Sequence, residues 1–115
     1  MIREGQVLLF KFPYADQIEG KVRPALVIRK VVGPHEDWLI CMISSQLSQK
    51  IEGFDEVLSK EDGDFRQSGL KQASVIRIGR LAVVQNMILL GSIGEINAER
   101  LERIKKKLSD WLLGR

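Results

Sequence analysis

The sequence contains very little cysteine and histidine, and these shortages exclude several kinds of site. Cys41 is the only cysteine among 115 residues, so the chain can form neither an internal disulfide nor a thiolate-rich metal site. Because Cys41 lies in the apolar run 39–43, we expect a buried, unreactive thiol. His35 is the only histidine and lies in the turn-like segment 33–37, where we expect a solvated side chain. One histidine also rules out a multi-histidine metal site. We expect no metal and no cofactor.

Long apolar runs are also missing. The longest uncharged stretch, residues 81–94, has 14 residues and includes Gln85 and Asn86, whereas a membrane-spanning helix needs about 20 apolar residues. Residues 1–5 do not show the basic-then-apolar pattern of a signal peptide. We expect a cytoplasmic protein that does not enter a membrane.

Most of the chain lacks an excess of charge of either sign. The net charge is +3, but residues 97–115 hold six Lys/Arg and three Asp/Glu and so carry all of it. Bulk charge is therefore weak evidence for nucleic-acid binding by the central part of the chain. Internal repeats, Gly-rich phosphate loops and paired catalytic carboxylates are absent as well.

The sequence does contain a series of short apolar segments typical of β-strands. They lie at residues 7–12, 25–32, 38–43, 54–58, 73–78 and 81–84, with turn residues between them. Gly33-Pro34 predicts an antiparallel hairpin, and Gly79-Arg80 separates the last two segments. We predict that the charged, Gly-containing segment 59–69 is a solvated loop, with a mobile lid or docking surface as the alternative. The pattern indicates one mainly β domain, residues 1–115, built as a small barrel or sandwich.

A C-terminal helix is predicted at about residues 97–113. Asn97 is a favourable N-cap, and Ile96 and Leu101 stand at the positions of a hydrophobic staple. Apolar residues then recur at helical spacing through Leu112. The basic run 105–107 either lies on a solvated helix face or contacts a nucleic acid, and the first is the more common arrangement.

Polar side chains gather between the first two predicted strands. This group consists of Tyr14, Asp16, Lys21 and Arg23. Pro24 restricts the residue before it to extended conformations, so we expect Arg23 to be held at the mouth of a strand. There its planar fork of donors suits a phosphate or a carboxylate, although an exposed loop arginine is an equally simple interpretation.

A second polar group, Ser44, Ser45 and Gln46, directly follows the predicted strand 38–43. Such a change from apolar to polar residues usually marks a strand leaving the core. Its functional interpretation is that a rigid scaffold holds hydroxyl and amide groups against a ligand.

Taken in order, these segments resemble the MazF/PemK-like toxins of bacterial toxin–antitoxin modules. The matching residues are Gly5-x-Val7, Phe12-Pro13-Tyr14-x-Asp16, Lys21-x-Arg23-Pro24-Ala25-Leu26-Val27, Ile43-Ser44-Ser45-Gln46 and Val75-Ile76-Arg77. The resemblance implies an SH3-like β-barrel of five to seven short strands with a C-terminal helix, usually a homodimer. It also implies a metal-independent, sequence-specific endoribonuclease acting on single-stranded mRNA, and a cognate antitoxin that covers the RNA-binding groove.

Within this resemblance, Arg23 and Ser44 match catalytic positions. Cleavage by the RNA's own 2′-OH leaves a 2′,3′-cyclic phosphate and a 5′-OH, and requires stabilisation of negative charge on the phosphate, which a bidentate arginine and a hydroxyl can supply. Supporting or substrate-binding roles fall to Tyr14, Asp16, Lys21, Ser45, Gln46 and Arg77. Tyr14 either stacks on a base or closes the barrel end, and Gln46 either reads a base edge or caps its strand.

Two positions depart from the family pattern. Val22 stands where some members have histidine, and Gly79, two residues after Arg77, stands where many have aspartate. Proton transfer then falls to other groups, such as Asp16 or Lys21, or the protein is slow or inactive as a nuclease. This leaves two alternatives: a non-enzymatic toxin of the same fold that acts on DNA gyrase, and a catalytically weak regulator that only binds the antitoxin.

Overall fold

The structure, a computed structural model, describes residues 1–11, 22–86 and 89–115. The strands in these ranges are β1 (Gln6–Lys11), β2 (Val22–Lys30), β3 (Asp37–Ser44), β4 (Glu56–Leu58), β5 (Ser74–Gln85) and β6 (Leu89–Glu95). The helices are the short 3₁₀ helix η1 (Leu47–Gln49), α1 (Phe65–Ser68) and the C-terminal α2 (Ala98–Leu112). No helix in the described ranges is long and apolar enough to cross a bilayer.

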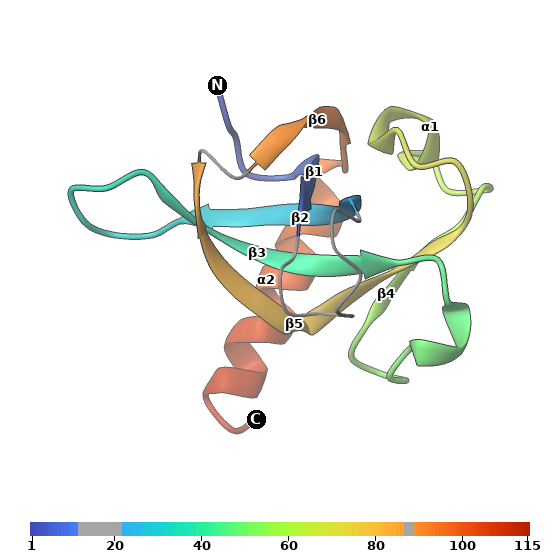
Figure 1. The fold of residues 1–115 in the computed structure, drawn as a ribbon. Coiled ribbons are helices and arrows are strands. Elements are labelled where there is room, and N and C mark those ends of the chain that lie inside the picture. Colours follow the sequence, from blue (N-terminus) through green and yellow to red (C-terminus); the bar gives the residue numbers. More distant parts are fainter. Residues whose placement is uncertain (12–21, 87–88) are drawn as a thin grey trace.

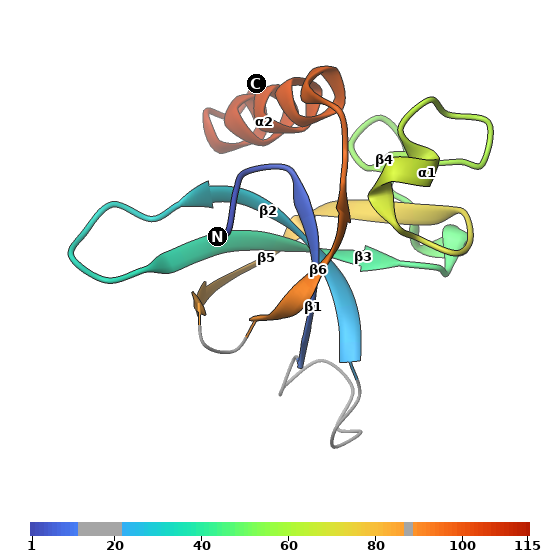
Figure 2. The same cartoon turned by 90° about the horizontal axis from the view of Figure 1, so that it is seen from above.

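The described strands form one antiparallel sheet in the order β4-β5-β3-β2-β1-β6. The sheet coils strongly, and the hairpin between β2 and β3 extends well beyond the rest of the molecule (Figures 1 and 2). The pairing does not close the sheet into a complete ring, but the arrangement is that of a small barrel-like fold. The predicted mainly β fold with a C-terminal helix is therefore confirmed.

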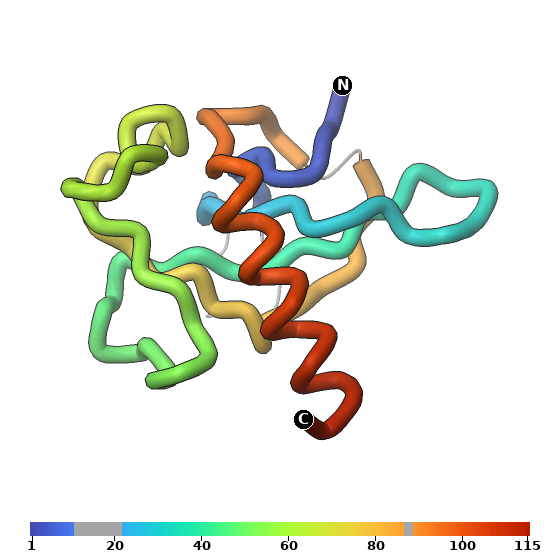
Figure 3. The backbone as a smooth tube through the Cα atoms, turned by 180° about the vertical axis from the view of Figure 1, so that it is seen from behind, coloured from blue at the N-terminus to red at the C-terminus, as the bar shows by residue number. Residues whose placement is uncertain are grey.

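The central strands are buried on both faces, which explains their nearly continuous apolar sequences. Helix α2 crosses one face (Figure 3) and packs Ile104 and Leu108 into the first core. The sheet side of this core includes Val7, Leu26, Cys41, Ile43, Ile76 and Ile78. The second core, on the opposite face, includes Leu8, Phe10, Ala25, Val27, Trp38, Ile40 and Val84. Cys41 is buried as expected, and this burial raises the pKa of its thiol well above the ordinary range, so the thiol is unreactive.

Strand β5 corrects the prediction of two separate strands at 73–78 and 81–84. Cys41 pairs with Leu81 and Met42 with Arg77, so residues 78–80 form a bulge within one continuous strand. Gly79-Arg80 thus bends the strand instead of ending it. Strand β6 was not predicted at all; it pairs with β1 and has two register irregularities.

Two glycines bring α1 close to β6. A Cβ atom on Gly94 would overlap the backbone of Gln67 and Ser68, and one on Gly69 would overlap the carbonyl of Ile93. Gly69 also ends α1 in the left-handed region, at φ 76°. The prediction of a solvated loop at 59–69 is therefore wrong, because this segment contains a helix and packs against the sheet.

Helix α2 begins as the sequence predicts. The Asn97 side chain accepts a hydrogen bond from the Arg100 N–H at 2.8 Å, which is the expected N-cap. Along the basic run, Lys105 contacts Glu4, Lys106 bonds Asp110 at 2.7 Å and Lys107 bonds Glu56 at 2.9 Å. These ion pairs favour a structural role for the run.

Candidate functional site

The predicted site residues divide into two groups. Arg23, Ser44, Ser45, Gln46 and Arg77 lie in described parts of the chain, whereas Tyr14, Asp16 and Lys21 lie outside the described residues. The residues in the first group come from β2, from the end of β3 with the turn after it, and from β5. Since β3 lies between β2 and β5 in the sheet, their strands are direct neighbours.

Arg23 is the second residue of β2 and pairs with Phe10 of β1. Because paired residues share a face of the sheet, Arg23 lies on the face of the second core. Pro24, the next residue, pairs with Leu9, while pairing between β2 and β3 begins only at Ala25. The proline therefore lies beyond the end of the β2–β3 ladder, where its missing N–H costs little. Arg23 is extended and half-buried there, as the X-Pro sequence predicts.

Ser44 is the last residue of β3 and is half-buried. The N–H of Gln46 donates to its Oγ at 3.0 Å. This bond uses a lone pair of the hydroxyl and leaves the Ser44 O–H to donate to a ligand. Ala25 pairs with Met42, and Arg23 and Ser44 each lie two residues from a member of this pair, so both lie on the same face of the sheet.

Arg77 completes this group from β5, where it lies opposite Met42. Its Nη1 donates to the side-chain oxygen of Gln49 at 3.3 Å. Its Nε is buried and has no acceptor among the described residues. The face around Met42 thus carries one arginine from β2, one from β5 and the hydroxyl of Ser44. Two guanidinium groups and a hydroxyl are donors suited to a phosphate group.

Ser45 and Gln46 lie outside the sheet and are exposed. Gln46 occupies the N-cap position of η1, and its side chain makes no capping hydrogen bond there. Within the described ranges, no cluster of His, Cys, Asp and Glu has the arrangement of metal ligands.

Gly79 has a packing role in this chain. A Cβ at this position would lie 3.3 Å from the ring of Phe54, closer than most Cβ contacts. Phe54 in turn packs against Trp111 of α2, with ring centroids 6.2 Å apart. A side chain at position 79 would therefore require the Phe54 ring to shift by a few tenths of an ångström.

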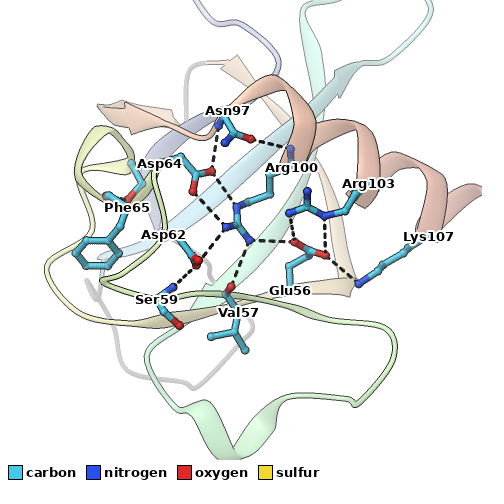
Figure 4. Close-up of polar contacts among 11 residues, drawn as sticks. Glu56, Val57, Ser59, Asp62, Asp64, Phe65, Asn97, Arg100, Arg103 and Lys107 are labelled. Atoms are coloured by element: carbon cyan, nitrogen blue, oxygen red, sulfur yellow. Dashed lines mark hydrogen bonds and ion pairs between the residues drawn. The ribbon is translucent and has the colours of Figure 1, made fainter.

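A buried ionic cluster, not identified from the sequence, joins α2 to β4 and to the segment that follows β4 (Figure 4). The Arg100 side chain donates to both carboxylate oxygens of Asp64, at 2.8 and 3.2 Å, and to Glu56 at 3.0 Å. It also lies 3.2 Å from a carboxylate oxygen of Asp62. The same Asp64 carboxylate accepts the N–H of Asn97 at 3.1 Å. Arg100 therefore ties the start of α2 to this segment with bidentate geometry.

The cluster holds the Glu56 and Asp64 carboxylates in the ionised form. Burial alone would raise the pKa of Glu56, but hydrogen bonds from Arg103 and Lys107, with their charges, outweigh it and lower that pKa. Burial likewise opposes ionisation of Asp64, yet hydrogen bonds from Arg100 and the Asn97 N–H lower its pKa. The cluster therefore stabilises the fold when these carboxylates are charged.

The free energy of unfolding should depend on pH through this cluster. Because the folded state lowers pKa values from ordinary values of 4.5 for Glu56 and 3.8 for Asp64, the contribution is complete above about pH 5 and is lost as the pH falls through and below those values. Urea titrations at pH values from 6 down to 3 should show that the free energy of unfolding falls less in Asp64→Asn than in the unmodified protein. Glu61→Gln, at an exposed position, serves as control and should lose as much as the unmodified protein. An equal loss in Asp64→Asn would contradict this role.

Comparison with known proteins agrees with the sequence resemblance. A family model described as the PemK-like, MazF-like toxin of type II toxin–antitoxin systems matches residues 3–112. The fold is similar to that of the Mycobacterium tuberculosis toxin MazF-mt6, with a TM-score of 0.64, 18% identity and coverage of 91% of this chain and 93% of that chain. It is also similar to an endoribonuclease in complex with its cognate antitoxin from a mycobacterial species, with a TM-score of 0.68, 13% identity and coverage of 97% and 95%. At these identities the structural similarity establishes the fold alone. No curated protein matches the sequence significantly.

Proposed function

Because this chain belongs to the PemK-like, MazF-like toxin family of type II toxin–antitoxin systems, we propose that it is a metal-independent, sequence-specific endoribonuclease. Its substrate is single-stranded mRNA. The 2′-OH attacks the adjacent phosphorus, the bond to the 5′-oxygen breaks, and the products carry a 2′,3′-cyclic phosphate and a 5′-OH. One proton leaves the 2′-OH and one reaches the departing 5′-oxygen.

The observation that carries this proposal is the position of Arg23, Ser44 and Arg77 on neighbouring strands, all on the face of the second core. Arg23 stabilises the extra negative charge on the phosphate through two parallel N–H donors. The Ser44 hydroxyl donates to a phosphate oxygen, and Arg77 adds a second positive charge. A guanidinium holds its proton too tightly to be a good general acid, so proton transfer falls to other groups, for which Asp16 or Lys21 is a candidate from the sequence.

Cleavage in excess EDTA tests the proposal. The purified protein should degrade a labelled single-stranded RNA pool at an unchanged rate when EDTA is added, because side chains supply the charge stabilisation. Denaturing gels would show fragments from the single-stranded pool and little cleavage of a fully paired duplex of the same sequences. Activity that disappears with EDTA and returns with a divalent metal would contradict the metal-independent mechanism.

We assign a cognate antitoxin as the protein partner, a homodimer as the assembly and the cytoplasm as the location. Support for the antitoxin comes from family membership and from the similar endoribonuclease that was solved with its own antitoxin. Expression of the chain alone should arrest growth, and co-expression of its cognate antitoxin, to be sought in the neighbouring reading frames, should restore it. Growth arrest that co-expression does not relieve would contradict this pairing.

One observation favours a second candidate, a toxin that binds DNA gyrase without cleaving RNA. Val22 precedes Arg23, and Gly79 lies beside the Phe54 ring, so neither position supplies an acid–base group. Growth arrest without RNA fragments, together with co-purification of gyrase, would support this candidate and exclude the nuclease.

A further inference from the structure

Gln49, which the sequence did not single out, contacts one of the arginines of the site. Its side-chain oxygen accepts the Nη1–H of Arg77 at 3.3 Å, across 28 residues of sequence. Gln49 is the last residue of η1, the turn that follows Ser44, Ser45 and Gln46. Its own N–H donates to the Gln46 carbonyl at 3.0 Å, which fixes its backbone. The backbone of Gln49 is therefore fixed beside β5, and its exposed side chain reaches Arg77 through this one hydrogen bond.

The contact with Gln49 fixes the direction in which the Arg77 guanidinium faces the surface. The Nε atom is buried, whereas the bond from Nη1 to Gln49 is exposed. The terminal nitrogens therefore lie at the surface, and one of them is already held. Fixing a rotatable fork in this way reduces the entropy that is lost when it binds a planar anion.

The partner of Arg77 is a neutral amide. Within the described ranges this hydrogen bond is the contact that the Arg77 side chain makes, and it forms no ion pair. A carboxylate in the same place would neutralise most of the positive charge, while the amide orients the fork and leaves that charge for a ligand. Gly79, two residues further on, supplies no carboxylate either.

We propose that Gln49 is a positioning residue that orients the Arg77 guanidinium toward a phosphate of the single-stranded RNA substrate. The inference rests on the proposed function, since it names a contact of that same site. Gln49 acts through Arg77 and takes part in no bond change. Its effect on RNA binding should therefore depend on whether Arg77 is present.

A double-mutant cycle tests this coupling. Affinity for a 2′-fluoro-substituted single-stranded RNA pool, which cannot be cleaved by its own 2′-OH, would be measured by fluorescence anisotropy. Gln49→Ala should weaken binding roughly fivefold, the effect of one modest hydrogen bond. In an Arg77→Ala background the same change should have no further effect. Gln72→Ala, at an exposed position before β5, is the matched control and should bind like the unmodified protein.

Gln49→Glu supplies a readout that a purely structural role would not change. The new carboxylate should pair with Arg77, weaken binding by at least about tenfold and reduce the salt dependence of binding by about one phosphate contact. Melting temperatures should stay the same for all single variants.

The outcomes distinguish a failure of the Gln49 inference from a failure of the proposed nuclease function. Equal effects of Gln49→Ala with and without Arg77, or a Gln49→Glu variant that binds as tightly as the unmodified protein, would overturn the inference. Unmodified protein that binds RNA without cleaving unsubstituted RNA would overturn the nuclease, while the cycle still decides the role of Gln49. Unmodified protein that binds no RNA would overturn both.

Discussion

Replacing Arg23 with alanine is expected to lower the RNA cleavage rate by about a thousandfold. Arginines that stabilise charge on a transferring phosphate, and single donors to a developing oxyanion, contribute effects of about this size. Arg23 lies at the mouth of β2 with Phe10 opposite in β1, so its truncation removes the donors and leaves the strand pairing intact. The measurement is single-turnover cleavage of a labelled single-stranded RNA pool in EDTA.

Two further variants sharpen this expectation. Arg29→Ala removes an exposed arginine from the same strand, at a position paired with Leu39, and should keep nearly full activity. Arg23→Lys keeps the charge but loses the planar fork, so its rate should lie between those of the unmodified protein and Arg23→Ala. Circular dichroism should show the native fold for all three. An Arg23→Ala variant within tenfold of the unmodified rate would contradict the assigned role.

Replacing Arg100 with alanine is expected to lower the free energy of unfolding by about 3–5 kcal/mol, because it leaves buried carboxylates without their partner. The side chain of Asp64 is only 1% exposed, and that of Glu56 is only 9% exposed. Domains of this size are stable by roughly 5–15 kcal/mol, so the loss is a large fraction of the total. Urea unfolding of the two proteins measures it.

Arg103 provides the matched control. It is also a cationic partner of Glu56, at 3.1 Å, but its side chain is 52% exposed, and ion pairs at exposed positions contribute about 0–1 kcal/mol. Arg103→Ala should therefore cost much less than Arg100→Ala. Arg100→Lys keeps a charge without bidentate geometry, so its loss of unfolding free energy should lie between those of Arg103→Ala and Arg100→Ala. If Arg100→Ala cost no more than Arg103→Ala, the cluster would not stabilise the fold as described.

The sequence predicted elements whose signals are local. Helix α2 begins where Asn97 caps it and Ile96 packs beneath it, because capping and staple interactions involve residues only a few positions apart. The hairpin of β2 and β3 was predicted for the same reason, from a Gly-Pro turn between two apolar runs. The order of matching segments from Gly5 to Arg77 then gave the family, which residues 3–112 confirm.

Elements that depend on distant partners were predicted less well. Strand β6 has the sequence Leu-Leu-Gly-Ser-Ile-Gly-Glu, which has a weak strand signal, and it forms by pairing with β1. Gly79-Arg80 resembled a turn because a bulge and a turn use similar residues, and only pairing with β3 distinguishes them.

The polar contacts of greatest consequence were not predictable from the sequence. Arg100 and Asp64 are 36 residues apart, and Arg77 and Gln49 are 28 apart. Charged residues are common in loops and on helix faces, so nothing in the sequence marked these as buried or paired. For the candidate site, the sequence named Arg23, Ser44 and Arg77, and the structure adds the register that brings their strands together and the contact with Gln49.

Identification of the RNA ends is the most direct test of the central claim that this chain is a metal-independent nuclease using the 2′-OH of its substrate. Fragments produced in EDTA would be analysed by mass spectrometry, with Arg23→Ala in parallel. We predict 2′,3′-cyclic phosphates and 5′-OH groups at every cut, and about a thousandfold fewer such fragments from Arg23→Ala over the same reaction time. Fragments with 5′-phosphates, or equal cleavage by Arg23→Ala, would contradict it.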